Sequence, residues 1–178
     1  MKIFIDQADK QDVVLSIIGA GDTLGEISLL DSAGHSASAV TLEDSLMLWM
    51  DKTSFHQMLD EFPRVSRNLV NIMSARLRMN NELIQALATM GVNGRVARQL
   101  LAFCDRYDPH NGSETVTIPI TLTQSDIADL VSASRKRVNY AMVAFREKGL
   151  ISINPAGKLV ILDRDGLKQY CQYNNPNN

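Results

Sequence analysis

The first fifty residues consist of short apolar runs separated by turn-forming residues. Residues 12–18 are rich in Val and Ile, and a turn cluster containing Gly and Asp follows at residues 19–22. Further runs of strand length lie at residues 24–30, 37–42 and 45–50, and a second turn cluster lies at residues 31–34. Short strands joined by close turns predict a small antiparallel roll or barrel, to which we assign residues 1–60.

The pattern becomes helical after residue 50. A short amphipathic helix is predicted for residues 51–60, and Pro63 is well placed in the first turn of a second helix. No Pro or Gly interrupts residues 64–89, where apolar residues recur at alternating spacings of three and four. These seam positions are Val70, Met73, Leu77, Asn80, Ile84 and Leu87. They predict that residues 61–90 form a dimerisation helix; a buried helix within a monomer is the alternative.

Both helices and strands are predicted for residues 91–173. The expected elements are a helix at 91–106, a polar loop at 108–113, a strand at 116–120, a hairpin of strands at 150–153 and 158–161, and a last helix at 163–173. The Asn-rich run at residues 174–178 is predicted to be a disordered tail.

The segment between residues 122 and 150 carries the strongest signal. Thr123 is a natural N-cap with an acidic residue, Asp126, three positions later, which is close to a capping box. After a short helix and a turn, Ser134 caps a second helix that extends to Lys148. Two capped helices joined by a short turn predict a helix-turn-helix, and the hairpin that follows makes it winged.

Basic and polar side chains crowd the first turns of the second helix, away from its apolar face. Arg reaches O6 and N7 of guanine with two hydrogen bonds, and hydroxyl and N–H groups at helix starts bind phosphates. The predicted DNA-binding residues are Thr123, Gln124, Ser125, Ser134, Arg135, Lys136, Arg137, Asn139 and Tyr140. The helix over residues 134–148 is therefore expected to enter the major groove of double-stranded DNA. The alternative is an ordinary helical hairpin with a solvated basic face.

Charge and cysteine content narrow the function further. The net charge of the chain is −2, but residues 1–60 hold three basic and ten acidic side chains, a local net charge of −7. The other fifteen basic and ten acidic side chains give the remainder a net charge of +5, which favours two modules with different partners. Two Cys far apart exclude a disulfide framework and a four-thiolate metal site, and we expect no metal and no cofactor.

Motifs for secretion, membrane insertion and catalysis are missing from the sequence. The N-terminus lacks the apolar stretch of a secretory signal, and no apolar run is long enough to span a bilayer. We therefore expect a cytoplasmic protein with no membrane contact. The sequence contains no GxSxG motif, no P-loop and no metal-ligand spacing, and its three His are scattered. We expect no enzymatic activity.

The chain resembles the bacterial cyclic-AMP receptor protein and fumarate–nitrate reduction regulator family over residues 12–173. The most specific part is residues 123–151. Residues 21–30 resemble the family's phosphate-binding segment, and the helix from Arg64 resembles its dimerisation helix. The resemblance implies an α+β fold: a partial cyclic-nucleotide-binding-like β-roll, a long dimerisation helix and a C-terminal winged helix-turn-helix at residues 91–173.

The resemblance also implies a function. Members of the family are dimeric transcription factors, so we expect a homodimer that binds a pseudo-palindromic operator. The loop at residues 108–114 lies where the family's activators touch RNA polymerase, which makes the polymerase a candidate partner. Lys136 replaces a Glu and Tyr140 an Arg that are common in the family's recognition helix, so the half-site is expected to differ. The alternative is a small-ligand sensor that signals through protein contacts rather than DNA.

The roll departs from the family at positions that would hold a cyclic nucleotide. The candidate effector-binding residues are Gly25, Glu26, Ser36, Ala37, Asn80 and Asn81. Ser36 and Ala37 stand where nucleotide-binding members carry an Arg and a hydroxyl residue, so cyclic AMP is predicted to bind weakly or not at all. Asn80 matches a position that meets the adenine in the family; alternatively, it sets the register of the seam. The roll begins at about the middle of the family's roll, which indicates either a fragment or a naturally short protein.

Overall fold

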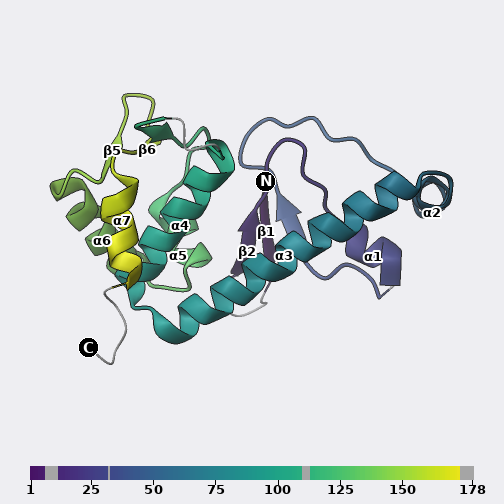
Figure 1. Cartoon of the computed structure of the whole chain (residues 1–178), viewed down its shortest axis with the longest axis horizontal. Helices are drawn as coiled ribbons and strands as arrows, with labels where there is room; N and C mark the ends of the chain where they lie inside the picture. Colours follow the sequence, from purple (N-terminus) through teal and green to yellow (C-terminus); the bar gives the residue numbers. More distant parts are fainter. Residues whose placement is uncertain (7–11, 32, 110–112, 173–178) are drawn as a thin grey trace.

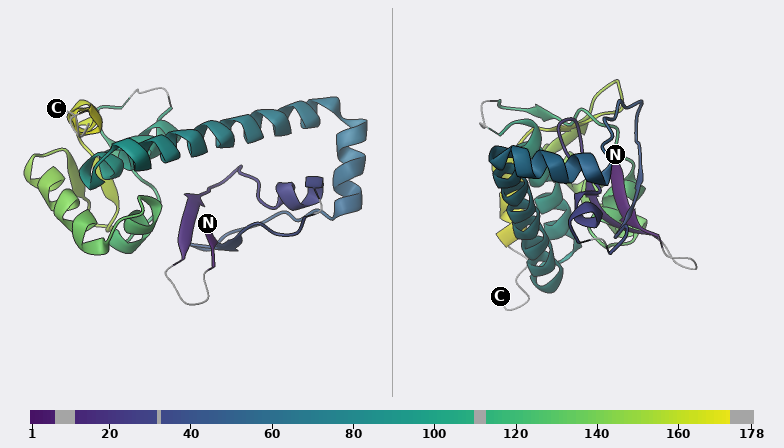
Figure 2. Two further views of the ribbon diagram at one scale, coloured as in Figure 1. Left: turned by 90° about the horizontal axis from the view of Figure 1, so that it is seen from below. Right: turned by 90° about the vertical axis from the view of Figure 1, so that its right-hand side faces the viewer.

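The computed structural model describes residues 1–6, 12–31, 33–109 and 113–172. A small N-terminal sheet module, a long helix and a C-terminal helical domain with a second sheet make up the chain (Figure 1). Figure 2 shows the long helix connecting the far end of the N-terminal module to the C-terminal domain. None of the described helices has the length and apolar character needed to cross a bilayer. The predicted tail at residues 174–178 lies outside the described residues.

The N-terminal sheet contains three antiparallel strands in the order β2-β1-β3. The strands are β1 (Lys2–Ile5), β2 (Val13–Ile17) and β3 (Ser38–Val40). The strand predictions for residues 12–18 and 37–42 are confirmed, although β3 is shorter than expected. The central strand, β1, is missed by the sequence analysis, because a short apolar run without alternation carries no clear strand signal. It becomes a strand because β2 and β3 pair with its two edges.

Two strand predictions in this module are wrong. Residues 24–30 lead into helix α1 (Glu26–Asp31), because Gly25 turns the chain with a φ of +84° and the Ser28 hydroxyl donates to Gly25 O over 2.7 Å. Residues 45–50 form no strand, since no described strand pairs with their backbone. Their apolar side chains are exposed instead, and Leu48 is 98% exposed.

Two helices lead from this module towards the C-terminal domain. Helix α2 (Lys52–Glu61) begins at Asp51, whose carboxylate accepts hydrogen bonds from the Ser54 backbone N–H and hydroxyl, both at 2.9 Å. These bonds lower the pKa of Asp51. Helix α3 (Pro63–Thr89) has Pro at its first position and no Gly, and it extends without interruption over 27 residues. Both helix predictions are confirmed.

The C-terminal domain is organised around helix α4 (Val92–Tyr107). Its other elements are β4 (Val116–Thr117), α5 (Gln124–Leu130), α6 (Arg135–Glu147), β5 (Ile151–Ile153), β6 (Leu159–Ile161) and α7 (Arg164–Gln172). The second sheet is antiparallel in the order β4-β6-β5, and α7 packs along α4. The strand predicted at residues 116–120 is shorter than expected, because Pro119 has no N–H to continue the ladder. The other elements of this domain are confirmed within the described residues.

One apolar core fills the C-terminal domain and extends into the N-terminal sheet. Leu100, Phe145 and Leu167 are fully buried, from α4, α6 and α7. Val14 and Ile17 of β2 belong to the same core. Because these two residues share the core, the sheet and the domain are packed as one unit. Burying each side chain of this size stabilises the fold by roughly 1.5–3 kcal/mol.

Five of the six predicted seam positions of α3 are exposed on the single chain, and Met73 is half-buried. Val70, Leu77 and Ile84 are 63%, 61% and 64% exposed. Of the residues in α3, only Ala86 is buried, where the helix approaches the C-terminal domain. Helix α3 is therefore not a buried helix within its own chain.

Candidate nucleic-acid interface

Helix α5 begins at a complete capping box. Thr123 Oγ1 accepts a hydrogen bond from the Asp126 backbone N–H at 3.1 Å, and Asp126 Oδ2 accepts from the Thr123 backbone N–H at 2.9 Å. The Thr123 hydroxyl also donates to Asp126 Oδ2 over 2.6 Å. The predicted box is confirmed, and it fixes the start of α5 with Ser125 exposed beside it. The hydroxyl proton of Thr123 is used within the box.

An Arg that the sequence analysis missed holds the turn between the two helices. Arg95 on α4 donates from Nε to Val131 O over 2.9 Å and from Nη2 to Ser132 O over 3.2 Å. Ser132 has a φ of +49°, in the left-handed region that residues other than Gly rarely adopt. Arg95 lies 36 positions before Val131, so no local pattern could have linked it to the turn.

Helix α6 presents its basic residues to solvent. Ser134 Oγ accepts from the Arg137 backbone N–H at 3.4 Å, which confirms the predicted cap. The buried face of α6 consists of Val138, Ala141, Met142 and Phe145. The exposed side chains of its first two turns are Arg135, Lys136, Arg137 and Tyr140. Among the described residues, none forms an ion pair with these three basic side chains, so their charges are available to a polyanion.

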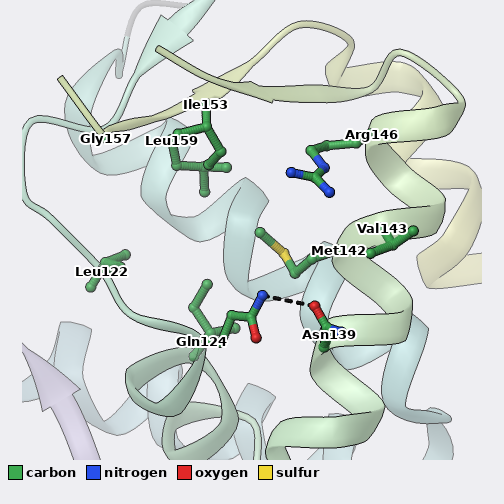
Figure 3. A pocket seen from close by; sticks show the side chains of 10 residues that line it. Leu122, Gln124, Asn139, Met142, Val143, Arg146, Ile153, Gly157 and Leu159 are labelled. Atoms are coloured by element: carbon green, nitrogen blue, oxygen red, sulfur yellow. Dashed lines mark hydrogen bonds between the residues drawn. The ribbon is translucent and has the colours of Figure 1, made fainter. Parts of the chain in front are cut away.

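A small cavity lies between α5, α6 and the hairpin of β5 and β6 (Figure 3). Gln124 and Asn139 border it, and Gln124 Nε2 donates to Asn139 Oδ1 over 2.8 Å. Arg146 and Ile153 lie on the hairpin side of the same cavity. The structure therefore brings two of the predicted DNA-binding residues, Gln124 and Asn139, into direct contact.

The predicted wing is a tight hairpin next to α6. Asn154 Oδ1 accepts hydrogen bonds from the backbone N–H groups of Ala156 at 3.0 Å and Lys158 at 2.9 Å. Gly157 has a φ of +74°, which a residue with a Cβ rarely adopts. The hairpin prediction is confirmed, and its turn is fixed by a side chain rather than by backbone bonds alone.

The candidate effector residues are only partly assembled in the structure. Glu26 is 4% exposed and forms an ion pair with Arg76 of α3, which the sequence analysis missed. Arg76 also donates to Thr23 O. The second carboxylate oxygen of Glu26, Oε2, is buried without a hydrogen-bond partner among the described residues. In the part of the chain that the structure describes, no hydrogen bond joins Glu26 to Ser36, Ala37, Asn80 or Asn81.

The described residues contain neither a candidate metal cluster nor a thiol with a lowered pKa. Residues 1–6, 12–31, 33–109 and 113–172 contain no cluster of three His, Cys, Asp or Glu side chains that could hold a metal ion. Burial raises the pKa of the Cys104 thiol to about 11, and burial also raises the pKa of Cys171. Thiols with raised pKa values are protonated at neutral pH and are poor nucleophiles.

Family models and curated relatives match both halves of the chain. Residues 94–170 match the Crp-like helix-turn-helix domain, and residues 1–62 match the cyclic nucleotide-binding domain. The chain is 33% identical to a CRP-like cAMP-activated global transcriptional regulator of Mycobacterium tuberculosis, over 86% of this chain and 67% of the relative. The chain belongs to the CRP/FNR family of transcriptional regulators. It is also 30% identical to the anaerobic regulatory protein of Bacillus subtilis, over 90% of this chain and 68% of that relative.

Solved structures of CRP/FNR-type proteins share the fold. A variant of CooA from Carboxydothermus hydrogenoformans superposes with a TM-score of 0.76 at 21% identity, covering 96% of this chain and 74% of that chain. The CRP/FNR family regulator TTHA1359 of Thermus thermophilus superposes with a TM-score of 0.66 at 21% identity, covering 97% and 84%. These likenesses confirm the expected architecture of β-roll module, long helix and C-terminal helix-turn-helix.

The family matches decide between two of the alternatives that the sequence left open for the C-terminal domain. The match over residues 94–170 confirms the predicted helix-turn-helix and excludes an ordinary helical hairpin. The curated relatives are transcriptional regulators, and the CRP/FNR family is made up of such regulators rather than of enzymes. Three points remain predictions: the residues that contact DNA, the residues of the dimer interface and the residues of the effector site.

Proposed function

We propose that this CRP/FNR-family protein is a homodimeric, sequence-specific regulator that places α6 in the major groove of a pseudo-palindromic operator. The cluster of Arg135, Lys136 and Arg137 carries this proposal, because it is exposed and makes no ion pair with the described residues. The capping box of α5 and the bonds from Arg95 hold the motif rigid. A helix whose first turn carries exposed positive charge is suited to base readout.

Position along α6 divides the proposed contacts into two kinds. Arg135, Lys136 and Tyr140 lie on the exposed face of its first two turns, where side chains reach base edges. Ser134 and Ser125 lie at the starts of the two helices, where phosphate contacts set the position of the motif without reading sequence. Arg135 is proposed to bind guanine with two hydrogen bonds, because it is the first residue of α6.

A second copy is proposed to cover the seam of α3. Val70, Leu77 and Ile84 are each more than half exposed in the single chain. Their burial against a partner helix would stabilise a pair by roughly 25 cal/mol per Å² of apolar surface covered. Asn80 would face its own copy in a parallel pair and fix the register. A two-fold axis along α3 would present two α6 helices to half-sites about one helical turn apart.

The β-roll module is proposed to act as a sensor with weak or no affinity for cyclic AMP. The relative from Mycobacterium tuberculosis is described as cAMP-activated, but here Ser36 and Ala37 provide no cationic partner for a cyclic phosphate. Arg76 lies beside the buried Glu26, and it already forms an ion pair with that carboxylate.

Two further assignments follow from the proposed role in transcription. We place the protein in the cytoplasm, where bacterial DNA is accessible, and RNA polymerase is proposed as a partner of the loop at residues 108–114. Part of this loop, residues 110–112, lies outside the described residues.

A second candidate function is a small-ligand sensor whose output is a protein contact. Oε2 of Glu26 favours it, because this oxygen is buried without a hydrogen-bond partner among the described residues and a ligand with a hydroxyl or N–H group could satisfy it. In that case the basic face of α6 would be a surface without a DNA role.

Selection of bound DNA from a random pool separates the two candidates. We expect the purified full chain to enrich a pseudo-palindrome whose half-sites lie about one helical turn apart. A mobility-shift assay with the enriched sequence and a scrambled control should show a clear preference for the enriched sequence. Equal retention of both DNAs, or of neither, would favour the sensor with a protein output.

A further inference from the structure

A short joint connects α3 to α4 at the place where the long helix meets the C-terminal domain (Figure 1). Met90 ends α3 and Gly91 precedes α4, and both have an extended backbone. Gly91 has no side chain to cap the start of α4. A short extended joint that contains Gly can act as a hinge between two helices unless other contacts hold it.

The guanidinium of Arg95 bonds to the backbone on both sides of this joint. Nη1 donates to Met90 O, at the end of α3, over 3.2 Å. Nε donates to Val131 O over 2.9 Å, and Nη2 donates to Ser132 O over 3.2 Å. Each of the three nitrogens has its own carbonyl partner, so Arg95 links the end of α3 to the turn between α5 and α6.

The carbonyls that Arg95 binds lie where helices need an outside donor. The last carbonyls of a helix have no partner within it, and Met90 and Val131 are the C-cap residues of α3 and α5. A positive charge near a helix C-terminus is also stabilised by the helix dipole. Arg95 is half-buried, which reduces the competition from water. The bridge is therefore suited to hold one geometry of the joint.

Two other Arg residues of α4 connect it to earlier parts of the chain. Arg98 Nη2 lies 2.7 Å from Glu82 Oε2 of α3, but the Glu82 side chain is 62% exposed, so this pair is expected to be weak. Arg106 Nη1 donates to Ile17 O over 2.7 Å and holds the N-terminal sheet against α4. Neither contact involves the turn of the helix-turn-helix.

We infer that Arg95 is a positioning residue that fixes the helix-turn-helix relative to the end of α3, and that it thereby sets the half-site spacing that the dimer accepts. The inference rests on the proposed dimer through α3 and on the proposed placement of α6 in the major groove. In such a dimer, two copies of the joint determine where the two α6 helices lie relative to the two-fold axis. Arg95 acts through the joint and need not touch DNA itself.

The geometry of DNA makes spacing a sensitive readout of this joint. One base pair added between the half-sites moves them apart by about 3.4 Å and rotates one against the other by roughly 35°. Two helix-turn-helix motifs that are held rigidly on α3 cannot follow this change, whereas motifs on a loose joint can. Loss of the bridge should therefore widen the range of spacings that the protein accepts.

Operators of altered spacing test this directly. The full chain is titrated with the operator selected from the random pool, and with the same operator after one base pair is added to or removed from its centre. The wild type is expected to lose roughly tenfold or more in affinity for each altered operator. Arg95→Met keeps the aliphatic stem but removes all three bonds, and it should lose roughly threefold or less.

A milder variant and a matched control accompany this test. Arg95→Lys should resemble Arg95→Met, because one ammonium nitrogen cannot take the place of three donors in a planar fork, and it decides the test if Arg95→Met does not fold. Arg98→Met removes an Arg from the same helix three positions later and should keep the wild-type spacing preference. Single-base variants at the original spacing should show an unchanged base preference for all three proteins. Melting temperatures identify any variant that is unfolded.

Each outcome decides the inference. A weaker spacing preference in the folded Arg95 variants, with base preference intact, supports it. A wild-type spacing preference in folded Arg95→Lys overturns it. Loss of base preference together with spacing preference, or an equal effect of Arg98→Met, also overturns it, because the effect would then come from general loosening of the domain. A wild-type protein that is monomeric or selects no sequence overturns the proposed function itself, which distinguishes that failure from the others.

Discussion

Lys2 Nζ at the start of β1 lies 3.8 Å from Oδ1 of Asp126, the residue that closes the capping box of α5. Asp126 therefore serves both modules, because its other oxygen, Oδ2, accepts the hydrogen bonds from Thr123. The two side chains are 20% and 13% exposed, so bulk solvent screens the pair only in part. The contact places the N-terminal sheet directly against the start of the helix-turn-helix.

The cap and the ion pair at Asp126 should differ in their contribution to stability. Asp126→Ala is expected to lower the free energy of unfolding by about 1–2 kcal/mol, because it removes the capping box. Lys2→Met keeps the aliphatic stem and is expected to cost less than about 1 kcal/mol. Urea unfolding followed by circular dichroism measures both. Equal losses from the two variants would show that the ion pair, rather than the cap, dominates.

The turn of the helix-turn-helix contains a residue that Gly would suit better. Ser132 has a φ of +49°, and a left-handed conformation costs a residue with a Cβ about 1–2 kcal/mol. Ser132→Gly is expected to raise the free energy of unfolding by about 0.5–1 kcal/mol, since the entropy of Gly in the unfolded chain offsets part of the gain. The matched control is Ala133→Gly, which should destabilise. Thermal unfolding of both variants checks this, and a loss of stability with Ser132→Gly contradicts it.

The exposed seam of α3 predicts a dimer in solution. Replacing Leu77 and Ile84 by Lys places like charges opposite each other in the seam and should yield monomers. Adding the same two charges off the seam, with Asn71→Lys and Gln85→Lys, should leave the dimer intact. Sedimentation equilibrium at micromolar concentration measures the mass. A monomeric wild type would show that the seam serves another purpose.

The β-roll module should bind cyclic AMP weakly or not at all. Ser36 and Ala37 supply neither the cation nor the hydroxyl that would hold a phosphodiester. Titration calorimetry with cyclic AMP is expected to show no binding at micromolar concentration, and the double substitution Ser36→Arg with Ala37→Ser is expected to raise the affinity. A micromolar dissociation constant for the unmodified protein would contradict the prediction that Ser36 and Ala37 prevent binding of cyclic AMP.

Features with local causes could be predicted from the sequence. The capping box of Thr123 and Asp126, the cap at Ser134 and the uninterrupted helix over residues 64–89 depend on neighbours three or four positions away, and the structure contains all of them. The resemblance carried by these local signals also predicted the observed order of β-roll module, long helix and helix-turn-helix.

Features that depend on a distant partner could not be predicted. Residues 45–50 have the composition of a strand, but no described strand pairs with them. In contrast, β1 becomes a strand because β2 and β3 pair with its two edges. Arg95 and Arg76 act on groups 36 to 53 positions away, and the Gln124–Asn139 bond links two helices. Such contacts arise from tertiary packing, which leaves no periodic signal in the sequence.

The central claim is that α6 reads DNA bases through its first turn, and single-base variants of the selected operator test it most directly. Arg135→Ala should cost roughly 1–3 kcal/mol and relax preference at one base pair of each half-site. Arg146→Ala, which removes the same charge near the far end of α6, should weaken all sequences equally or leave them unchanged. Both variants are to be compared at two salt concentrations, because phosphate contacts alone carry the salt dependence. Loss of preference confined to Arg135→Ala is the predicted result; a uniform loss of affinity with base preference intact would contradict base reading by this helix.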